Sequence, residues 1–181
     1  MTDIDKRCLD TFPEWLRSLG SDAGDLAEAL GNDALPDDVR RAAAGGLNYL
    51  FKSLDLIPDG IEDLGYLDDA FVMRVAAALA LAAAPGVAEQ APKLARLAGE
   101  AALIRELLGA DYPRLETYVA RLKTGAARGR SVDDILGEES LRRDFMTEVA
   151  GWSKSYECPT FARDEKNLVK LKSFLSAKLP R

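Results

Sequence analysis

The stretch that decides the fold is residues 55–69, which read Asp-Leu-Ile-Pro-Asp-Gly-Ile-Glu-Asp-Leu-Gly-Tyr-Leu-Asp-Asp. It joins two segments whose apolar residues have helical spacing, at residues 36–53 and 66–84. Ile57-Pro58 ends the first helix, because the residue before a proline is disfavoured in the helical conformation. Gly60 and Gly65 are available for turns. The pattern predicts a helical hairpin with an acidic elbow that contains six carboxylates.

The remainder of the 181 residues also favours helix. Leu and Ala dominate the apolar residues, whereas the β-branched residues are sparse. We expect an all-α bundle of about seven to nine helices built around the hairpin. The stretch 125–130, rich in Gly, Ala and Arg, is typical of a linker. It divides the chain into a helical domain, residues 1–124, and carboxyl-terminal helices, residues 125–181, that pack on it or form a small second lobe.

Local signals refine this prediction in the first third of the chain. Pro13 is expected to begin a helix that ends at Gly20, with a separate short helix after it. In the helix 36–53, Leu54 is expected to close a buried stripe. Gly45-Gly46 inside that helix indicates either a close approach by another backbone or a tolerated irregularity, since two interior glycines cost stability.

The composition excludes several classes of function. The chain has no histidine, which removes the usual general base near neutral pH, the common catalytic triads and imidazole zinc sites. A net charge of −6 does not supply the cationic field of a nucleic-acid-binding protein, so we expect no nucleic acid partner. Through Asp69 there are 16 acids and 6 bases, whereas residues 70–181 carry 14 acids and 18 bases. The two parts are expected to attract each other.

A membrane location is not expected. The apolar run from Ala70 to Ala84 contains Arg74 and is shorter than the roughly 20 residues that cross a bilayer, so we expect no transmembrane segment. The basic last helix has an apolar stripe suited to ordinary core packing, and peripheral membrane contact is not expected. Cys8 and Cys158 lie far apart without a CxxC motif or a secretory signal, which favours reduced thiols and a cytoplasmic location.

The segment from Tyr49 to Ala70 resembles the central motif of the YkvA-like family, a widespread bacterial domain of unknown function (domain of unknown function 1232). The resemblance covers about residues 43–80 and is carried by Asp55-Leu-Ile-Pro-Asp, Ile61 and Gly65-Tyr-Leu-Asp-Asp. At two positions where family members often have proline, this chain has Ser53 and Glu62. The resemblance implies no reaction. Some members are membrane-associated through further apolar segments, which this sequence does not show.

The acids of the elbow have two interpretations. In the favoured one, Asp68 and Asp69 cap the next helix, Asp55 caps the turn that follows it, and Asp59 closes a turn at Gly60. The alternative is a site for a hard cation, Mg²⁺ or Ca²⁺, whose ligands would be Asp55, Asp59, Asp68 and Asp69. Their spacing does not match an EF-hand loop. A phosphate-containing ligand would then pair with Arg40, Arg41 or Arg74.

For function, we expect a non-enzymatic interaction or scaffold protein that has no cofactor and engages a protein partner. The alternative is a divalent-cation-dependent enzyme or sensor that acts on a phosphorylated small molecule through the acidic turn.

Overall fold

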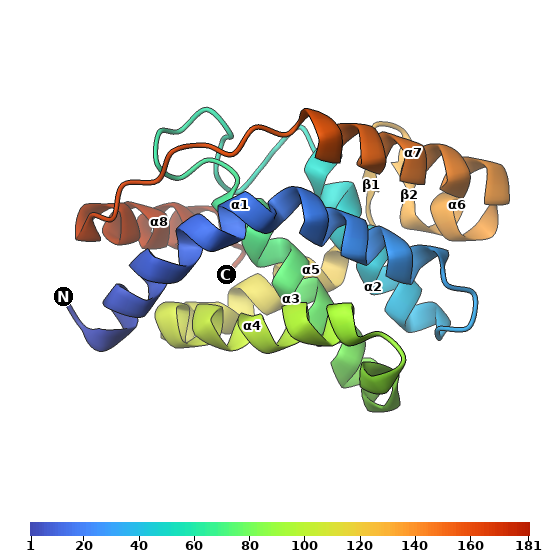
Figure 1. Ribbon diagram of the computed structural model, residues 1–181, viewed down its shortest axis with the longest axis horizontal. Helices are drawn as coiled ribbons and strands as arrows, with labels where there is room; N and C mark the ends of the chain where they lie inside the picture. The colour runs from blue at the N-terminus through green and yellow to red at the C-terminus, as the bar shows by residue number, and fades with distance from the viewer.

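The structure, a computed structural model, describes all 181 residues and consists almost entirely of helices (Figure 1). The predicted all-α fold is confirmed, and the number of helices falls within the expected range. The α-helices are α1 (Asp3–Gly31), α2 (Asp37–Asn48), α3 (Leu67–Ala83), α4 (Pro92–Leu108), α5 (Tyr112–Leu122), α6 (Val132–Gly137), α7 (Glu139–Ser155) and α8 (Glu165–Lys178). Three short 3₁₀ helices are η1 (Tyr49–Phe51), η2 (Pro85–Glu89) and η3 (Gly109–Asp111). A small antiparallel hairpin, β1 (Ala126–Ala127) and β2 (Arg130–Ser131), pairs Ala126 with Ser131.

Helix α1 is a single long helix, so the predicted break at Gly20 is wrong. A capping box starts it, in which Thr2 and Asp5 satisfy each other's backbone amides. It continues through Pro13 because its length packs on α2, α3, α4 and α7, and this packing outweighs the local helix-breaking signals. Gly20 serves the contact with α7. The Ser153 hydroxyl donates to the Gly20 carbonyl at 2.6 Å, and a Cβ at Gly20 would lie 3.1 Å from the Ser153 Oγ.

The predicted hairpin is formed by α2 and α3, and the expected close approach by another backbone occurs at Gly45. A Cβ on Gly45 would lie 3.0 Å from the backbone at Leu122, and one on Gly46 would lie 3.0 Å from the Ala76 Cβ. The first helix ends earlier than predicted, because α2 tightens into η1 after Asn48. Leu54 is therefore outside the helical stripe and is 82% exposed, contrary to its predicted burial.

One apolar core of 49 buried residues extends from Cys8 to Leu179. Helix α7 packs on α1, α6 packs on α2, and α8 packs on α1. The connector 156–164 between α7 and α8 passes beside the elbow of the hairpin, and the Ala162 amide donates to Asp63 at 2.9 Å (Figure 1). The division of the chain at residue 125 stays a prediction.

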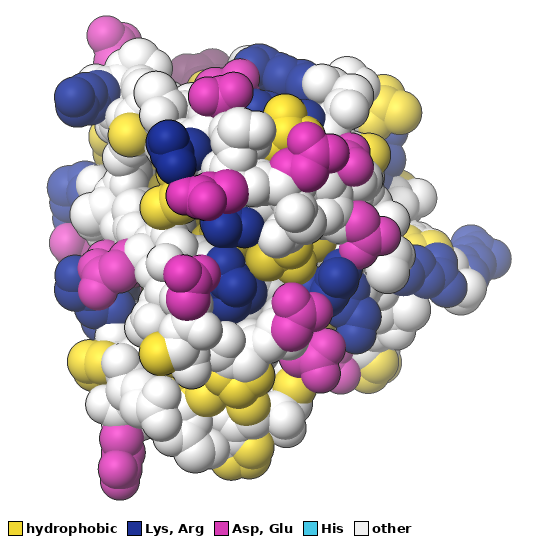
Figure 2. Space-filling model, turned by 90° about the vertical axis from the view of Figure 1, so that its right-hand side faces the viewer, with side chains coloured by type: hydrophobic (Ala, Val, Ile, Leu, Met, Phe, Trp, Pro, Cys, Tyr) yellow, Lys and Arg dark blue, Asp and Glu magenta, His cyan; other side chains and the backbone are white.

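None of the helices has the length and apolar character that a bilayer crossing would demand. At the end of the molecule where α6 and the start of α7 lie, basic and acidic side chains are interspersed with small apolar areas (Figure 2). Both cysteine thiols are free, Cys8 in the core and Cys158 on the surface.

Candidate metal centre

The elbow is a series of tight turns between η1 and α3. The Ile61 amide donates to the Pro58 carbonyl at 3.0 Å, and the Gly65 amide donates to the Ile61 carbonyl at 2.9 Å. Asp63 and Tyr66 adopt positive φ angles of 64° and 67°, which side-chain-bearing residues seldom do. These turns fold the chain back so that residue 59 approaches the start of α3.

Gly65 is required by this close approach. A Cβ at this position would lie 2.1 Å from the Asp59 carbonyl oxygen and 3.0 Å from its carbon. Both atoms belong to the backbone, so no side-chain rotation would relieve the contact. The glycine thus lets Asp59 lie against the segment that leads into α3.

Three of the four predicted ligands come together as a result. One carboxylate oxygen from each of Asp59, Asp68 and Asp69 lies within 4.8 Å of the others. Asp59 is exposed, whereas Asp68 is fully buried and Asp69 is 3% exposed. Asp55 is not part of this group, although its charge raises the pKa of Asp69. We call Asp59, Asp68 and Asp69 the carboxylate cluster.

The Asp68 carboxylate is held by one of its two oxygens. The Tyr49 hydroxyl donates to Asp68 Oδ2 at 2.5 Å, and the Ile57 amide donates to the same oxygen at 3.0 Å. Tyr49 is itself fixed, because its hydroxyl accepts a hydrogen bond from the Leu56 amide at 2.7 Å. The second oxygen, Asp68 Oδ1, has no hydrogen-bond partner in the protein, and neither has Asp69 Oδ2. Buried carboxylate oxygens without partners are costly, so this cluster differs from ordinary turn acids.

Burial is the main cause of the raised pKa values in the carboxylate cluster. It raises the pKa of Asp69 well above its usual value, and the neighbouring charges of Asp68 and Asp59 raise it further. Burial also raises the pKa of Asp68, to about 6, although the hydrogen bond from Tyr49 opposes the shift. The pKa of Asp55 rises to about 7 through burial and the charges of Asp59 and Asp68. The folded protein therefore holds several acids that resist ionisation when no cation balances them.

No Lys or Arg forms an ion pair with Asp55 or with the carboxylate cluster. The three arginines predicted to pair with a phosphate-containing ligand form ion pairs elsewhere. Arg40 pairs with Asp33, and Arg41 pairs with Asp37 and Asp133.

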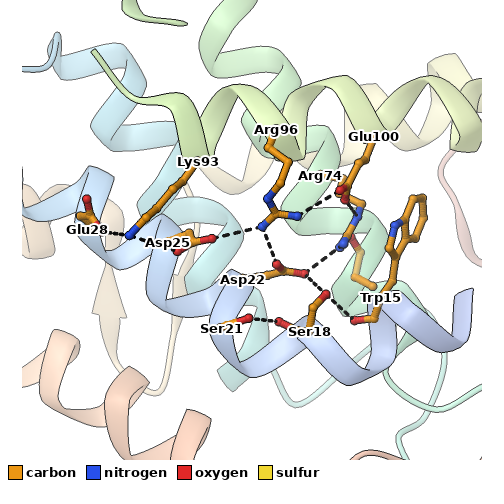
Figure 3. Close-up of polar contacts among 11 residues, drawn as sticks. Trp15, Ser18, Ser21, Asp22, Asp25, Glu28, Arg74, Lys93, Arg96 and Glu100 are labelled. Carbon is orange, nitrogen blue, oxygen red and sulfur yellow. Dashed lines mark hydrogen bonds and ion pairs between the residues drawn. The ribbon is translucent and has the colours of Figure 1, made fainter. Parts of the chain in front are cut away.

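Arg74, the third of these, belongs to a separate buried network that joins α1, α3 and α4 (Figure 3). Its Nη2 lies 3.0 Å from Asp22 Oδ2 and its Nε lies 2.7 Å from Glu100 Oε2. Its guanidinium carbon lies 4.1 Å from the centre of the Trp15 ring, and Arg96 contacts the other Asp22 oxygen at 2.8 Å. Each buried charge has its partners, so this network fixes three helices together and offers no group for a ligand.

The side-chain contacts at the start of α3 differ from those of an ordinary helix cap. The residue that precedes α3 is Tyr66, and no side chain caps the helix there. Tyr49 and Ile57, both outside α3, donate hydrogen bonds to the Asp68 carboxylate, and the Asp69 amide in the first turn of α3 also lowers the pKa of Asp68. For Asp69, burial without a hydrogen-bond partner at Oδ2 is the opposite of what capping produces.

The donor set fits a hard divalent cation. Mg²⁺ and Ca²⁺ bind carboxylate oxygens, complete their coordination with water or carbonyl oxygens, and do not need imidazole or thiolate ligands. Asp59, Asp68 and Asp69 would hold such an ion. Tyr49, which orients Asp68, was not predicted as part of this site, because a tyrosine with helical spacing is typical of core packing.

The fold and this site define an all-α protein in which a helical hairpin carries a buried carboxylate cluster at its elbow. Residues 39–74 match the model of a family described as "Protein of unknown function (DUF1232)", which confirms the resemblance over α2, the elbow and the first part of α3. The matched segment contains Tyr49, Asp55 and the complete carboxylate cluster. No curated protein and no solved structure matches the chain.

Proposed function

We propose that this chain is a non-enzymatic interaction protein whose hairpin elbow binds one divalent cation through Asp59, Asp68 and Asp69. The observation that carries the proposal is the pair of buried, adjacent carboxylates, each with an oxygen that has no hydrogen-bond partner in the protein. Two such groups repel each other, and a cation removes both the repulsion and the unsatisfied oxygens.

The cation has a structural role in this proposal. It ties residue 59 in the elbow to residues 68 and 69 in the first turn of α3, and it thereby holds the α2–α3 hairpin in one geometry. Because metal ligands must be deprotonated, the ion also competes with the protons that the raised pKa values favour.

The burial of the proposed ligands favours a structural role for the cation over a catalytic one. A catalytic cation keeps an open position for substrate, whereas two of the three ligands here are at most 3% exposed. The two hollows with volumes of about 480 and 400 Å³ are lined by other residues, so neither leads a small molecule to the carboxylate cluster. These features support the non-enzymatic interpretation over an enzyme or sensor that acts through the acidic turn.

The test is calorimetric titration of the full chain with Mg²⁺, Ca²⁺ and Mn²⁺ at pH 7.5. We expect saturable binding of one ion, weakened at least about tenfold by Asp69→Asn, because the amide removes a charged ligand. Asp10→Asn is the matched control, since Asp10 is an exposed acid of α1 whose ion pair is with Arg163.

Two results would contradict the proposal. One is the absence of saturable binding for all three ions. The other is a loss of stability in Asp69→Asn measured without divalent cations, which would identify the carboxylate as a structural hydrogen-bond acceptor.

A further inference from the structure

A second feature of interest is a hollow of about 400 Å³ between two short segments that are distant in sequence. One is residues 51–54, at the end of η1, and the other is residues 126–129, in the small β-hairpin. Its size lies in the range of small-molecule sites in proteins. None of the carboxylate cluster lines it.

Two cationic side chains line the hollow, one from each segment. Lys52 and Arg128 are in no ion pair, although the chain as a whole is acidic. Each rests on an aromatic ring. Lys52 Nζ lies 5.5 Å from the centre of the Tyr118 ring, and the Arg128 guanidinium carbon lies 4.9 Å from that of Phe51. The Phe51 ring is part of the lining, whereas Tyr118 is not, and neither cation–π contact neutralises the charge that it holds.

The rest of the lining is largely apolar. Leu54 is 82% exposed, one of three large apolar side chains with high exposure, and the other two are Met1 and Val169. Ala126 and Ala127 lie on the opposite segment. An anion with an apolar body would therefore meet both positive charge and apolar surface in this hollow.

We propose that this hollow binds a small phosphorylated molecule with an apolar body. The phosphate group, with about two negative charges near neutral pH, matches two unpaired cations, and the Arg128 fork suits bidentate contact with its oxygens. The apolar body lies against Leu54. The proposal concerns a site separate from the carboxylate cluster and does not require a cation there.

The same chemistry occurs in the headgroup of an anionic lipid. A membrane-binding surface inserts several apolar side chains, whereas Leu54 is the one large apolar side chain with high exposure at this hollow. The proposal therefore commits to a free small molecule, and lipid binding is an outcome that would overturn it.

The experiment uses the full chain in buffer freed of divalent cations by a chelating resin, so that its result does not depend on the cation site. Phenyl phosphate and inorganic phosphate serve as probes in a titration followed by NMR chemical shifts. We expect saturable binding of phenyl phosphate with shifts at residues 51–54 and 126–129, and weaker binding of inorganic phosphate. The double variant Lys52→Gln/Arg128→Gln should lose at least about tenfold in affinity, because two charged contacts are removed.

Arg121→Gln/Lys170→Gln makes the same change in net charge at two positions outside the hollow and should bind as the unmodified chain does. Leu54→Ser should weaken the binding of phenyl phosphate and leave that of inorganic phosphate unchanged. The proposal is overturned if the Lys52→Gln/Arg128→Gln variant binds phenyl phosphate as tightly as the unmodified chain, or if phenylacetate binds as tightly as phenyl phosphate. It is also overturned if the chain binds vesicles that contain phosphatidic acid but not phenyl phosphate.

Discussion

At the residue scale, Tyr49 decides how the carboxylate cluster presents its oxygens. Its hydroxyl donates to Asp68 Oδ2 and accepts from the Leu56 amide, so both capacities of the hydroxyl are used within the elbow. Because Oδ2 is taken by Tyr49 and Ile57, Oδ1 is the oxygen of Asp68 that remains for a cation. Groups that orient metal ligands in this way commonly change metal affinity tenfold or more when they are removed.

Tyr49→Phe tests this role. The variant keeps the ring and its packing but removes the donor to Asp68, so we expect about a tenfold loss in cation affinity. It should also move cation binding to higher pH, because the hydrogen bond from Tyr49 is what restrains the rise in the pKa of Asp68. Titrations at several pH values measure both effects.

Tyr112→Phe is the control for this substitution. Tyr112 is also buried, but its hydroxyl has no hydrogen-bond partner and it lies outside the elbow. Unchanged affinity and an unchanged pH profile in Tyr49→Phe would show that Tyr49 does not act through Asp68. A loss of stability alone would follow from the unpaired Leu56 amide and would not support the proposed role.

The residues of the site were unequally predictable from sequence. The four aspartates stand out because their spacing among turn residues is unusual, and the structure gathers Asp59, Asp68 and Asp69. Tyr49 gave no signal, because a buried tyrosine with helical spacing is typical of core packing. Leu54 was misplaced for a different reason. The buried stripe was extrapolated past the point where α2 becomes a 3₁₀ helix, and a 3.6-residue period no longer applies there.

At the element scale, the elbow depends on backbone contact more than on side-chain packing. Gly65 lies against the Asp59 carbonyl, whereas Gly60, five residues earlier, has no atom within 4 Å of the position that a Cβ would occupy. The two glycines therefore form a matched pair. They belong to the same acidic turn and differ in whether a methyl group would be accommodated.

We expect Gly65→Ala to displace residue 59 from the start of α3, with loss of cation binding and a fall in the free energy of unfolding of about 2 kcal/mol or more. Gly60→Ala should leave both quantities nearly unchanged. Thermal unfolding with and without Mn²⁺ measures stability and the stabilisation by the cation together. Equal stabilisation by Mn²⁺ in both variants would mean that the approach of residue 59 to α3 is not needed for binding.

The contrast between local signals and long-range packing explains which helix boundaries can be predicted from the sequence. Pro92 at the start of α4 and the capping box that Ser131 makes at the start of α6 are local start signals, and both helices form there. The break predicted within α1 failed because Pro13 and Gly20 are local signals too, but long-range packing on four other helices decides there. A contact such as Ser153 with Gly20, 133 residues apart, has no trace in a local pattern.

At the scale of the whole molecule, the uneven charge of the sequence is used internally. Acids of α1 pair with bases from later in the chain: Asp22 with Arg74 and Arg96, Glu28 with Lys93, and Asp10 with Arg163. The acids of the elbow take no part in this pairing. The attraction between the acidic and basic parts was thus predictable, whereas the exclusion of the elbow from it required the fold.

Because the acids of the elbow form no ion pairs, their burial predicts how the stability of the protein depends on pH. In the unfolded chain the pKa values of Asp55, Asp68 and Asp69 return to about 3.9, whereas in the folded protein those of Asp68 and Asp55 are about 6 and 7 and that of Asp69 is well raised. Between about pH 4 and 7 the folded protein therefore binds more protons than the unfolded chain, and the free energy of unfolding falls as pH rises.

Without divalent cations, we expect a lower Tm at pH 8 than at pH 5.5, and saturating Mn²⁺ or Mg²⁺ should narrow this difference because the ion replaces the lost protons. Asp69→Asn should flatten the cation-free profile, whereas Asp10→Asn should not. Asp5 and Asp134 do not obscure the result, because their pKa values are lowered in the folded protein. They change the stability only below about pH 4, outside the range compared. A cation-free Tm that rises from pH 5.5 to 8 would mean that the elbow carboxylates are ionised and stabilised by the protein itself, and the need for a cation would disappear.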